Sequence, residues 1–77
     1  MTPLTLCRLN DKVYRVLTQQ GDHVGNLKLI QGAWKFKAIG YEADGAMVPG
    51  CGPLTQRHNT ILTTLDEREL NARLVPD

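Results

Sequence analysis

Aromatic residues, cysteines and long apolar runs are all scarce in this chain of 77 residues. Small secreted domains held by disulfides usually carry about two to four bridges, whereas this sequence has only Cys7 and Cys51, so we expect two free thiols. The apolar runs are only a few residues long, which excludes a membrane-spanning helix. The first residues lack the basic and apolar regions of a secretory signal. We therefore expect a cytoplasmic protein with no membrane partner.

Length and composition indicate a single globular domain over residues 1–77. The chain is 42% hydrophobic and 22% charged, which is typical of a globular domain and unlike a disordered segment. A chain this short supports only one small core. We expect an α+β domain.

The charges are few and unevenly distributed. The net charge is only +1, but residues 1–37 carry six positive and two negative side chains, and residues 38–77 carry three positive and six negative ones. Such asymmetry indicates an anionic partner for the basic half. It also fits two halves that face each other or lie on different sides of the domain.

Residues 26–41 show the clearest pattern, an alternation of apolar and basic side chains around Gln31-Gly32. This pattern predicts a β-hairpin with a two-residue turn and with Lys28 directly opposite Lys35. A second two-residue turn at Gly21-Asp22 extends the hairpin into an antiparallel meander within a sheet over residues 3–43.

The predicted register assigns the side chains to two faces, because successive residues of a strand point in opposite directions. The core face holds one row of Tyr14, Leu29 and Trp34 and another of Val16, Leu27 and Phe36. The outer face holds one line of Arg15, Lys28 and Lys35, with Lys37 opposite Asn26. A four-residue loop in place of Gly21-Asp22 would slide one strand by two positions, which changes the rows but not the faces. A bulge at Gly32 would instead set Lys28 beside Trp34.

The remaining segments are less regular. Leu4, Leu6 and Cys7 predict an edge strand, and the Gly- and Pro-rich stretch 45–59 predicts an irregular loop. After a short extended piece at residues 60–62, Thr64 and Glu67 have the spacing of a capping box. They open a predicted helix over residues 65–74, in which Glu69 and Arg73 form an i, i+4 pair and which packs on the core face of the sheet. The predicted core comprises Tyr14, Val16, Leu27, Leu29, Trp34, Phe36, Leu65, Leu70 and Leu74, with Ile61 or Leu62.

The outer face of the meander is the first candidate site. Rows of lysine and arginine on a sheet can contact several phosphates, and amide side chains can read base edges. The predicted binding residues are Arg15, Asn26, Lys28, Lys35 and Lys37. We therefore expect a non-enzymatic binding domain with nucleic acid as its partner.

The main alternative is a protein-interaction or homodimerisation module. Val13, Ile30 and Ile39 share the outer face in the predicted register, which suggests that the loop, a second subunit or a partner protein covers part of it. Lysines are also common on solvated strand faces, where they discourage aggregation.

A remote alternative is a thiol-dependent enzyme that uses Cys51. The loop places this cysteine between glycines, with Arg57 and His58 nearby, and a neighbouring cation can activate a thiol. No third orienting residue is evident, so we expect no catalytic site. Cys7, His23, Cys51 and His58 match no zinc module in their spacing, and we expect neither a metal nor a cofactor.

Overall fold

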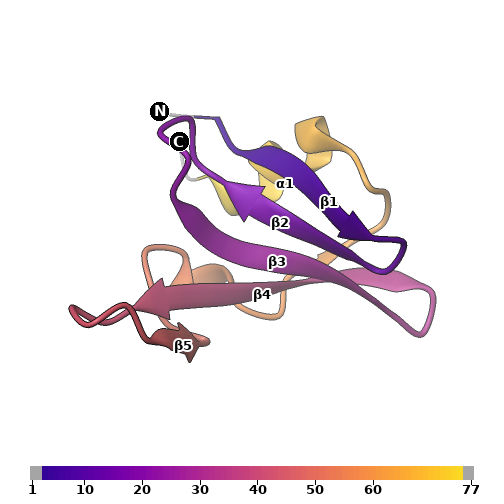
Figure 1. The fold of residues 1–77 in the computed structure, drawn as a ribbon. Helices are drawn as coiled ribbons and strands as arrows, with labels where there is room; N and C mark the ends of the chain where they lie inside the picture. Colours follow the sequence, from indigo (N-terminus) through magenta and orange to yellow (C-terminus); the bar gives the residue numbers. More distant parts are fainter. Residues whose placement is uncertain (1–2, 76–77) are drawn as a thin grey trace.

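The computed structural model describes residues 3–75, which form a six-stranded antiparallel sheet and one C-terminal helix (Figure 1). Five strands are neighbours in chain order: β1 (Thr5–Asn10), β2 (Val13–Leu17), β3 (His23–Ile30), β4 (Ala33–Tyr41) and β5 (Met47–Pro49). A 3-10 turn, η1 (Thr55–Arg57), precedes β6 (Ile61–Leu62), which pairs with β4, and α1 covers Glu67–Leu74. The predicted α+β class, with an antiparallel meander and a C-terminal helix, is confirmed.

The hairpin of β3 and β4 has the predicted register. Lys28 lies opposite Lys35, and Leu27 lies opposite Phe36. The turn requires positive φ at both central residues, which are Gln31 at 50° and Gly32 at 80°. Glycine adopts this conformation without strain and glutamine does not. The agreement of the two flanking strands therefore determines the turn despite an unfavourable residue.

The predicted two-residue turn at Gly21-Asp22 is wrong. Five residues, 18–22, connect β2 to β3, and an irregularity in the pairing follows Val16. The pairing slides by two positions, so Arg15 lies opposite Asn26 instead of Lys28. Because a two-residue shift preserves the direction of each side chain, the residues of β2 keep their predicted faces.

Two further predictions need correction. The stretch 45–59 is not irregular throughout, since it contains β5 and η1. The helix begins at Glu67, and its N-cap is Asp66, whose carboxylate accepts a hydrogen bond from the Arg68 amide. The capping box predicted at Thr64 is therefore absent. The helix begins three residues after Thr64, so Asp66 holds the N-cap position, and the Thr64 hydroxyl instead donates to Glu69.

The core lies between the concave face of the sheet and α1. Of the predicted residues, Leu29 is only half-buried. Tyr14 and Trp34 are partly buried against the core, and their two rings pack edge to face on each other with centroids 5.6 Å apart. Of the two residues of β6, Leu62 is fully buried and Ile61 is 51% exposed. The buried cluster consists of Leu4, Val16, Val24, Leu27, Phe36, Ala38, Leu62, Leu70 and Leu74.

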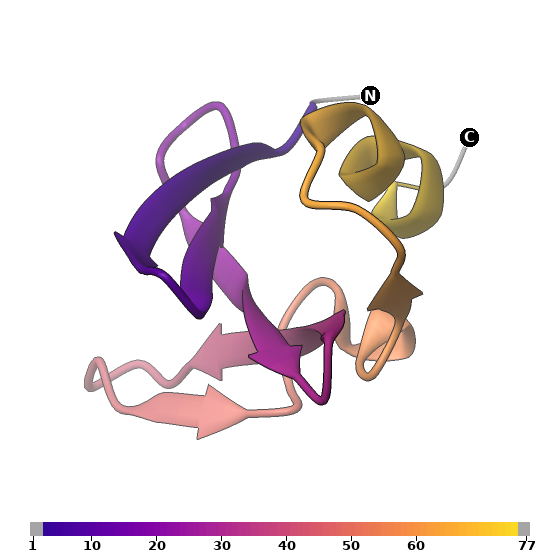
Figure 2. The same cartoon turned by 90° about the vertical axis from the view of Figure 1, so that its right-hand side faces the viewer.

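Side chains of α1 occupy the free edge of β1. Asn71 accepts a hydrogen bond from the Leu4 amide at 2.6 Å and donates one to the Leu4 carbonyl at 3.1 Å. Glu67 accepts from the Leu6 amide at 2.8 Å. Figure 2 shows α1 between the start of β1 and β6. The helix thus closes the curled sheet on its concave side and does not cover the opposite face of the meander.

Both edges of β4 are paired. Its first edge pairs with β3, and its second edge is shared between β6 at Trp34 and Lys35 and β5 from Ile39 onwards. Between these two short strands, the amide of Phe36 donates to the Thr60 carbonyl at 2.7 Å. β4 is therefore the central strand, which pairs with β3, β5 and β6.

Helices long and apolar enough to span a membrane do not occur within residues 3–75.

Glu69 holds the segment that enters α1. Its carboxylate accepts hydrogen bonds from the hydroxyl of Thr64 at 2.7 Å and from the amide of Thr63 at 3.2 Å, and these bonds, in that order, lower its pKa to about 2 from an ordinary 4.5. The predicted pair with Arg73 is confirmed, with Nε and Oε2 3.2 Å apart.

The low pKa of Glu69 predicts a specific acid sensitivity. A lowered folded-state pKa stabilises the fold above about pH 4.5, and this contribution is lost as the pH falls towards 2. We expect Glu69→Gln to unfold at lower urea concentration than the wild type at pH 6, and the difference to shrink between pH 4.5 and pH 2. A difference that stays constant over this range would contradict the assignment.

Candidate nucleic-acid interface

The outer face of β2, β3 and β4 carries every residue predicted to bind nucleic acid. We call Arg15, Asn26, Lys28, Lys35 and Lys37 the basic face. They alternate along their strands with the buried Val16, Leu27 and Phe36, so the burial of the core directs the charged side chains outwards. The helix packs on the core side, and therefore it does not cover the basic face.

The first row of the basic face contains the opposed lysines. In this row Val13, Lys28, Lys35 and Ile61 follow one another across β2, β3, β4 and β6. Like charges directly opposite on adjacent strands are destabilising. The two ion pairs within residues 3–75 are Arg8 with Asp11 and Arg73 with Glu69, so no carboxylate there neutralises the lysines.

The second row contains Arg15, Asn26 and Lys37, and not the line of three cations predicted from the sequence. The ammonium group of Lys37 donates to Oδ1 of Asn59 at 2.6 Å, which is a neutral partner. Arg15 is exposed and, within the described part of the chain, has no ion-pair partner. All four cations of the basic face therefore keep an uncompensated charge.

A hydrogen-bonded chain of side chains extends the second row towards the end of β4. Oδ1 of Asn26 can only accept, so Nε2 of His23 donates to it at 2.8 Å, and Nδ1 then accepts from the Tyr41 hydroxyl at 2.8 Å. The sequence did not reveal this arrangement. His23 shares a face with Asn26 only because of the irregularity between β2 and β3, for which the sequence gives no signal.

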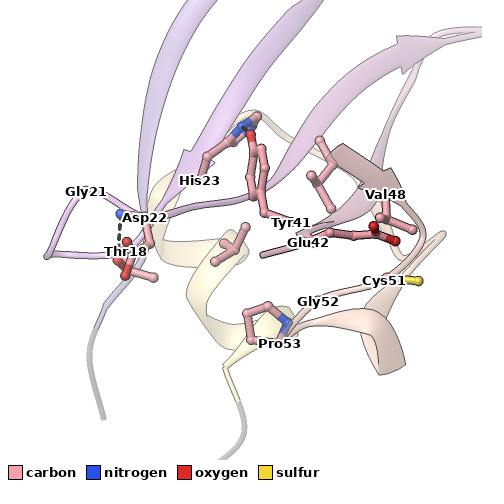
Figure 3. Close-up of a pocket in the computed structure, with 13 residues that line it drawn as sticks. Thr18, Gly21, Asp22, His23, Tyr41, Glu42, Val48, Cys51, Gly52 and Pro53 are labelled. Atoms are coloured by element: carbon pink, nitrogen blue, oxygen red, sulfur yellow. Dashed lines mark hydrogen bonds between the residues drawn. The ribbon is translucent and has the colours of Figure 1, made fainter. Parts of the chain in front are cut away.

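An open groove of about 950 Å³ lies beside Tyr41. It is formed by the loop between β2 and β3, the end of β4 and the segment 48–53 (Figure 3). The segment packs closely against β4, since a Cβ atom on Gly40 would lie 2.7 Å from the Gly52 nitrogen. The groove is lined by Thr18, Gly21, Asp22, His23, Val24, Ile39, Gly40, Tyr41, Glu42, Val48, Cys51, Gly52 and Pro53.

No side-chain hydrogen bond within residues 3–75 joins the loop candidates Cys51, Arg57 and His58 to one another. Nδ1 of His58 accepts the Ala38 amide at 3.0 Å, so the imidazole satisfies the stretch of β4 edge between β5 and β6. Cys51 is an exposed free thiol at the groove, and Arg57 is half-buried. With its Nδ1 engaged by backbone, His58 has a structural role.

The four sulfur and imidazole residues are placed separately. Cys7 lies on β1 opposite Arg15, whereas His23 is engaged by Tyr41 and Asn26. Over residues 3–75, no group of three or more His, Cys, Asp or Glu side chains is arranged to hold a metal ion.

The apolar residues of the outer face differ in exposure. Ile39 is only 4% exposed in the single chain, so it is covered by its own polypeptide and not by a partner. Ile30 is exposed and Val13 is half-buried. Ile39 is therefore lost from the apolar surface on which a dimer or protein contact was predicted, whereas Ile61, which lies opposite Lys35 and is 51% exposed, adds to it.

No family model, curated protein or solved structure matches this chain.

The opposed lysines predict a gain in stability when one charge is reversed. In Lys28→Glu the repulsion with Lys35 becomes an attraction, worth about 0.2–1 kcal/mol. Urea denaturation at low salt should show a higher unfolding midpoint, and Lys28→Gln should lie between the variant and the wild type. A lower midpoint for Lys28→Glu than for Lys28→Gln would contradict the repulsion.

The hydrogen bond of His58 to the backbone predicts that replacing His58 lowers the unfolding free energy more than replacing His23 does. His58→Leu removes the acceptor of the Ala38 amide and should cost about 1–3 kcal/mol of unfolding free energy. The control His23→Leu frees only side chains that can turn towards water, so its cost should be smaller. Equal losses in urea denaturation would argue against a structural role specific to His58.

Proposed function

We propose that this protein is a non-enzymatic domain that binds nucleic acid. Its basic face contacts the phosphates of the nucleic-acid backbone. The observation that supports this most strongly is the direct opposition of Lys28 and Lys35 without any neutralising carboxylate in the described chain. A polyanion offsets this repulsion, because a phosphate placed between the two lysines adds an attractive contact with each of them.

The distribution of the other charges supports the same proposal. The net charge is nearly zero, but the acidic residues of α1 lie on the opposite side of the sheet from the basic face. Asp22 and Glu42 line the groove, which lies beyond the end of the basic face. The outer face therefore presents a local positive field, which attracts phosphates despite the small overall charge.

Mixed contacts are a further supporting feature. Asn26 lies between Arg15 and Lys37, so an amide is placed among phosphate-binding cations, where it can contact a base edge or sugar.

A protein-interaction module remains the competing proposal. It would use Val13, Ile30 and the segment 45–59, but its contacts would depend little on salt.

The test is the salt dependence of binding to fluorescein-labelled DNA, measured by anisotropy between 50 and 300 mM NaCl. With four phosphates contacted, the logarithm of the affinity should fall with a slope of about −3 to −4 against the logarithm of the salt concentration. The double variant Lys28→Glu with Lys35→Glu should bind more weakly and reduce the slope by about 2.

The matched control is Lys12→Glu with Arg68→Glu. It makes the same change in net charge, but Lys12 lies in the turn between β1 and β2 and Arg68 lies on α1. It should retain most of the affinity. If both double variants lose affinity equally, or if binding is insensitive to salt, the basic face is not a phosphate-binding surface.

A further inference from the structure

Tyr41 is the one aromatic side chain of the described structure that combines high exposure with a fixed position. It is 53% exposed at the end of β4, on the same face as Lys37. Its hydroxyl donates to His23, and the two ring centroids lie 6.1 Å apart with a tilt of 50°. The hydrogen bond restrains the ring, so a base that stacks on it would meet a surface already in place.

The ring of Tyr41 lies beyond the basic face, further along β4 on the same side of the sheet. Tyr41 lies four positions after Lys37 on β4, or about 13 Å along the strand. His23 bridges the remaining distance on the neighbouring strand, since it contacts both Tyr41 and Asn26. A strand of nucleic acid whose phosphates contact the cations can thus reach the ring within a few nucleotides.

The charges around the groove disfavour a phosphate there and permit an uncharged base. Among residues 3–75, no lysine or arginine lines it, and Asp22 and Glu42 come from opposite sides of it (Figure 3). Within residues 3–75 neither carboxylate forms an ion pair. Phosphates are therefore repelled from the groove, whereas an uncharged base with amino donors is accepted.

The other aromatic rings cannot serve this purpose. Phe36 is fully buried, and Tyr14 and Trp34 pack against each other on the core side. A duplex keeps its bases stacked inside the helix, so only an unpaired base can reach the ring of Tyr41.

We propose that the nucleic acid is single-stranded, with its phosphates on the basic face and one unpaired base stacked on Tyr41 at the mouth of the groove. This inference rests on the proposed function and narrows its ligand from nucleic acid in general to a strand with unpaired bases.

The test compares a labelled single-stranded DNA of mixed sequence with a duplex of the same strand, by anisotropy at several NaCl concentrations between 50 and 300 mM, with the two affinities compared at each concentration. Stacking of one base contributes on the order of tenfold in affinity. Wild type should bind the single strand about tenfold more tightly than the duplex. Tyr41→Ala should remove this preference, lose affinity for the single strand and leave duplex binding and the salt slope unchanged.

Two variants keep the result interpretable. Tyr41→Phe retains the ring and should bind single strands within about twofold of wild type, whereas Tyr41→Leu retains apolar bulk without a π-face and should behave like Tyr41→Ala. Emission from Trp34, which packs against Tyr14 in the core cluster, reports whether each variant is folded.

The outcomes separate this inference from the function on which it rests. If Tyr41→Ala and Tyr41→Leu are folded and bind single strands as wild type does, Tyr41 is not a stacking platform and the inference is overturned. The proposed function survives that result if Lys28→Glu with Lys35→Glu still weakens binding. If neither DNA binds in a salt-dependent manner, both proposals fail together.

Discussion

The pairing of β4 on both of its edges is the constraint on which the rest of the structure depends. Its first edge fixes the register with β3, and that register places Lys28 opposite Lys35. Its second edge is satisfied in turn by β6, the Thr60 carbonyl, the His58 imidazole and β5. Buried backbone groups must find partners, so the segment after β4 has to return along this strand, even though it is too irregular to form one continuous strand.

This return path determines what the outer face can do. The residues after β5 lie along the second edge and then lead into α1, whose Leu70 and Leu74 cover the core side. The helix also hydrogen-bonds to the free edge of β1 through Asn71 and Glu67. One face of the meander is therefore closed by the chain itself, and the other presents cations, an amide and the restrained ring of Tyr41.

The sequence predicted the faces of the sheet well and the connections poorly. Alternation placed Arg15, Lys28, Lys35 and Lys37 correctly outside, because side-chain direction in a strand depends only on parity. The prediction that Arg15 shares a row with Lys28 and Lys35 was wrong, since Arg15 lies opposite Asn26. Nothing in residues 18–22 distinguishes a five-residue connection from a two-residue turn. Asp66 rather than Thr64 caps the helix, since both residue types are good caps and the choice depends on where the chain leaves β6.

The same limits apply to the candidate site. The charges of the basic face are local consequences of alternation, whereas the contact between His23 and Tyr41 joins residues 18 positions apart across an irregularity in the sheet. His58 carried no signal for a backbone contact, because histidines at loops are more often solvated. Residues that depend on long-range pairing are thus the ones that the sequence left unassigned.

The most direct test of this binding surface is an NMR titration of the ¹⁵N-labelled protein with a short single-stranded DNA. The largest amide shift changes should fall on the strands that carry Arg15, Lys28, Lys37 and Tyr41, and residues 67–74 of α1 should change little. Shift changes concentrated on α1, or no changes at low salt, would contradict the assignment of the outer face as the binding surface.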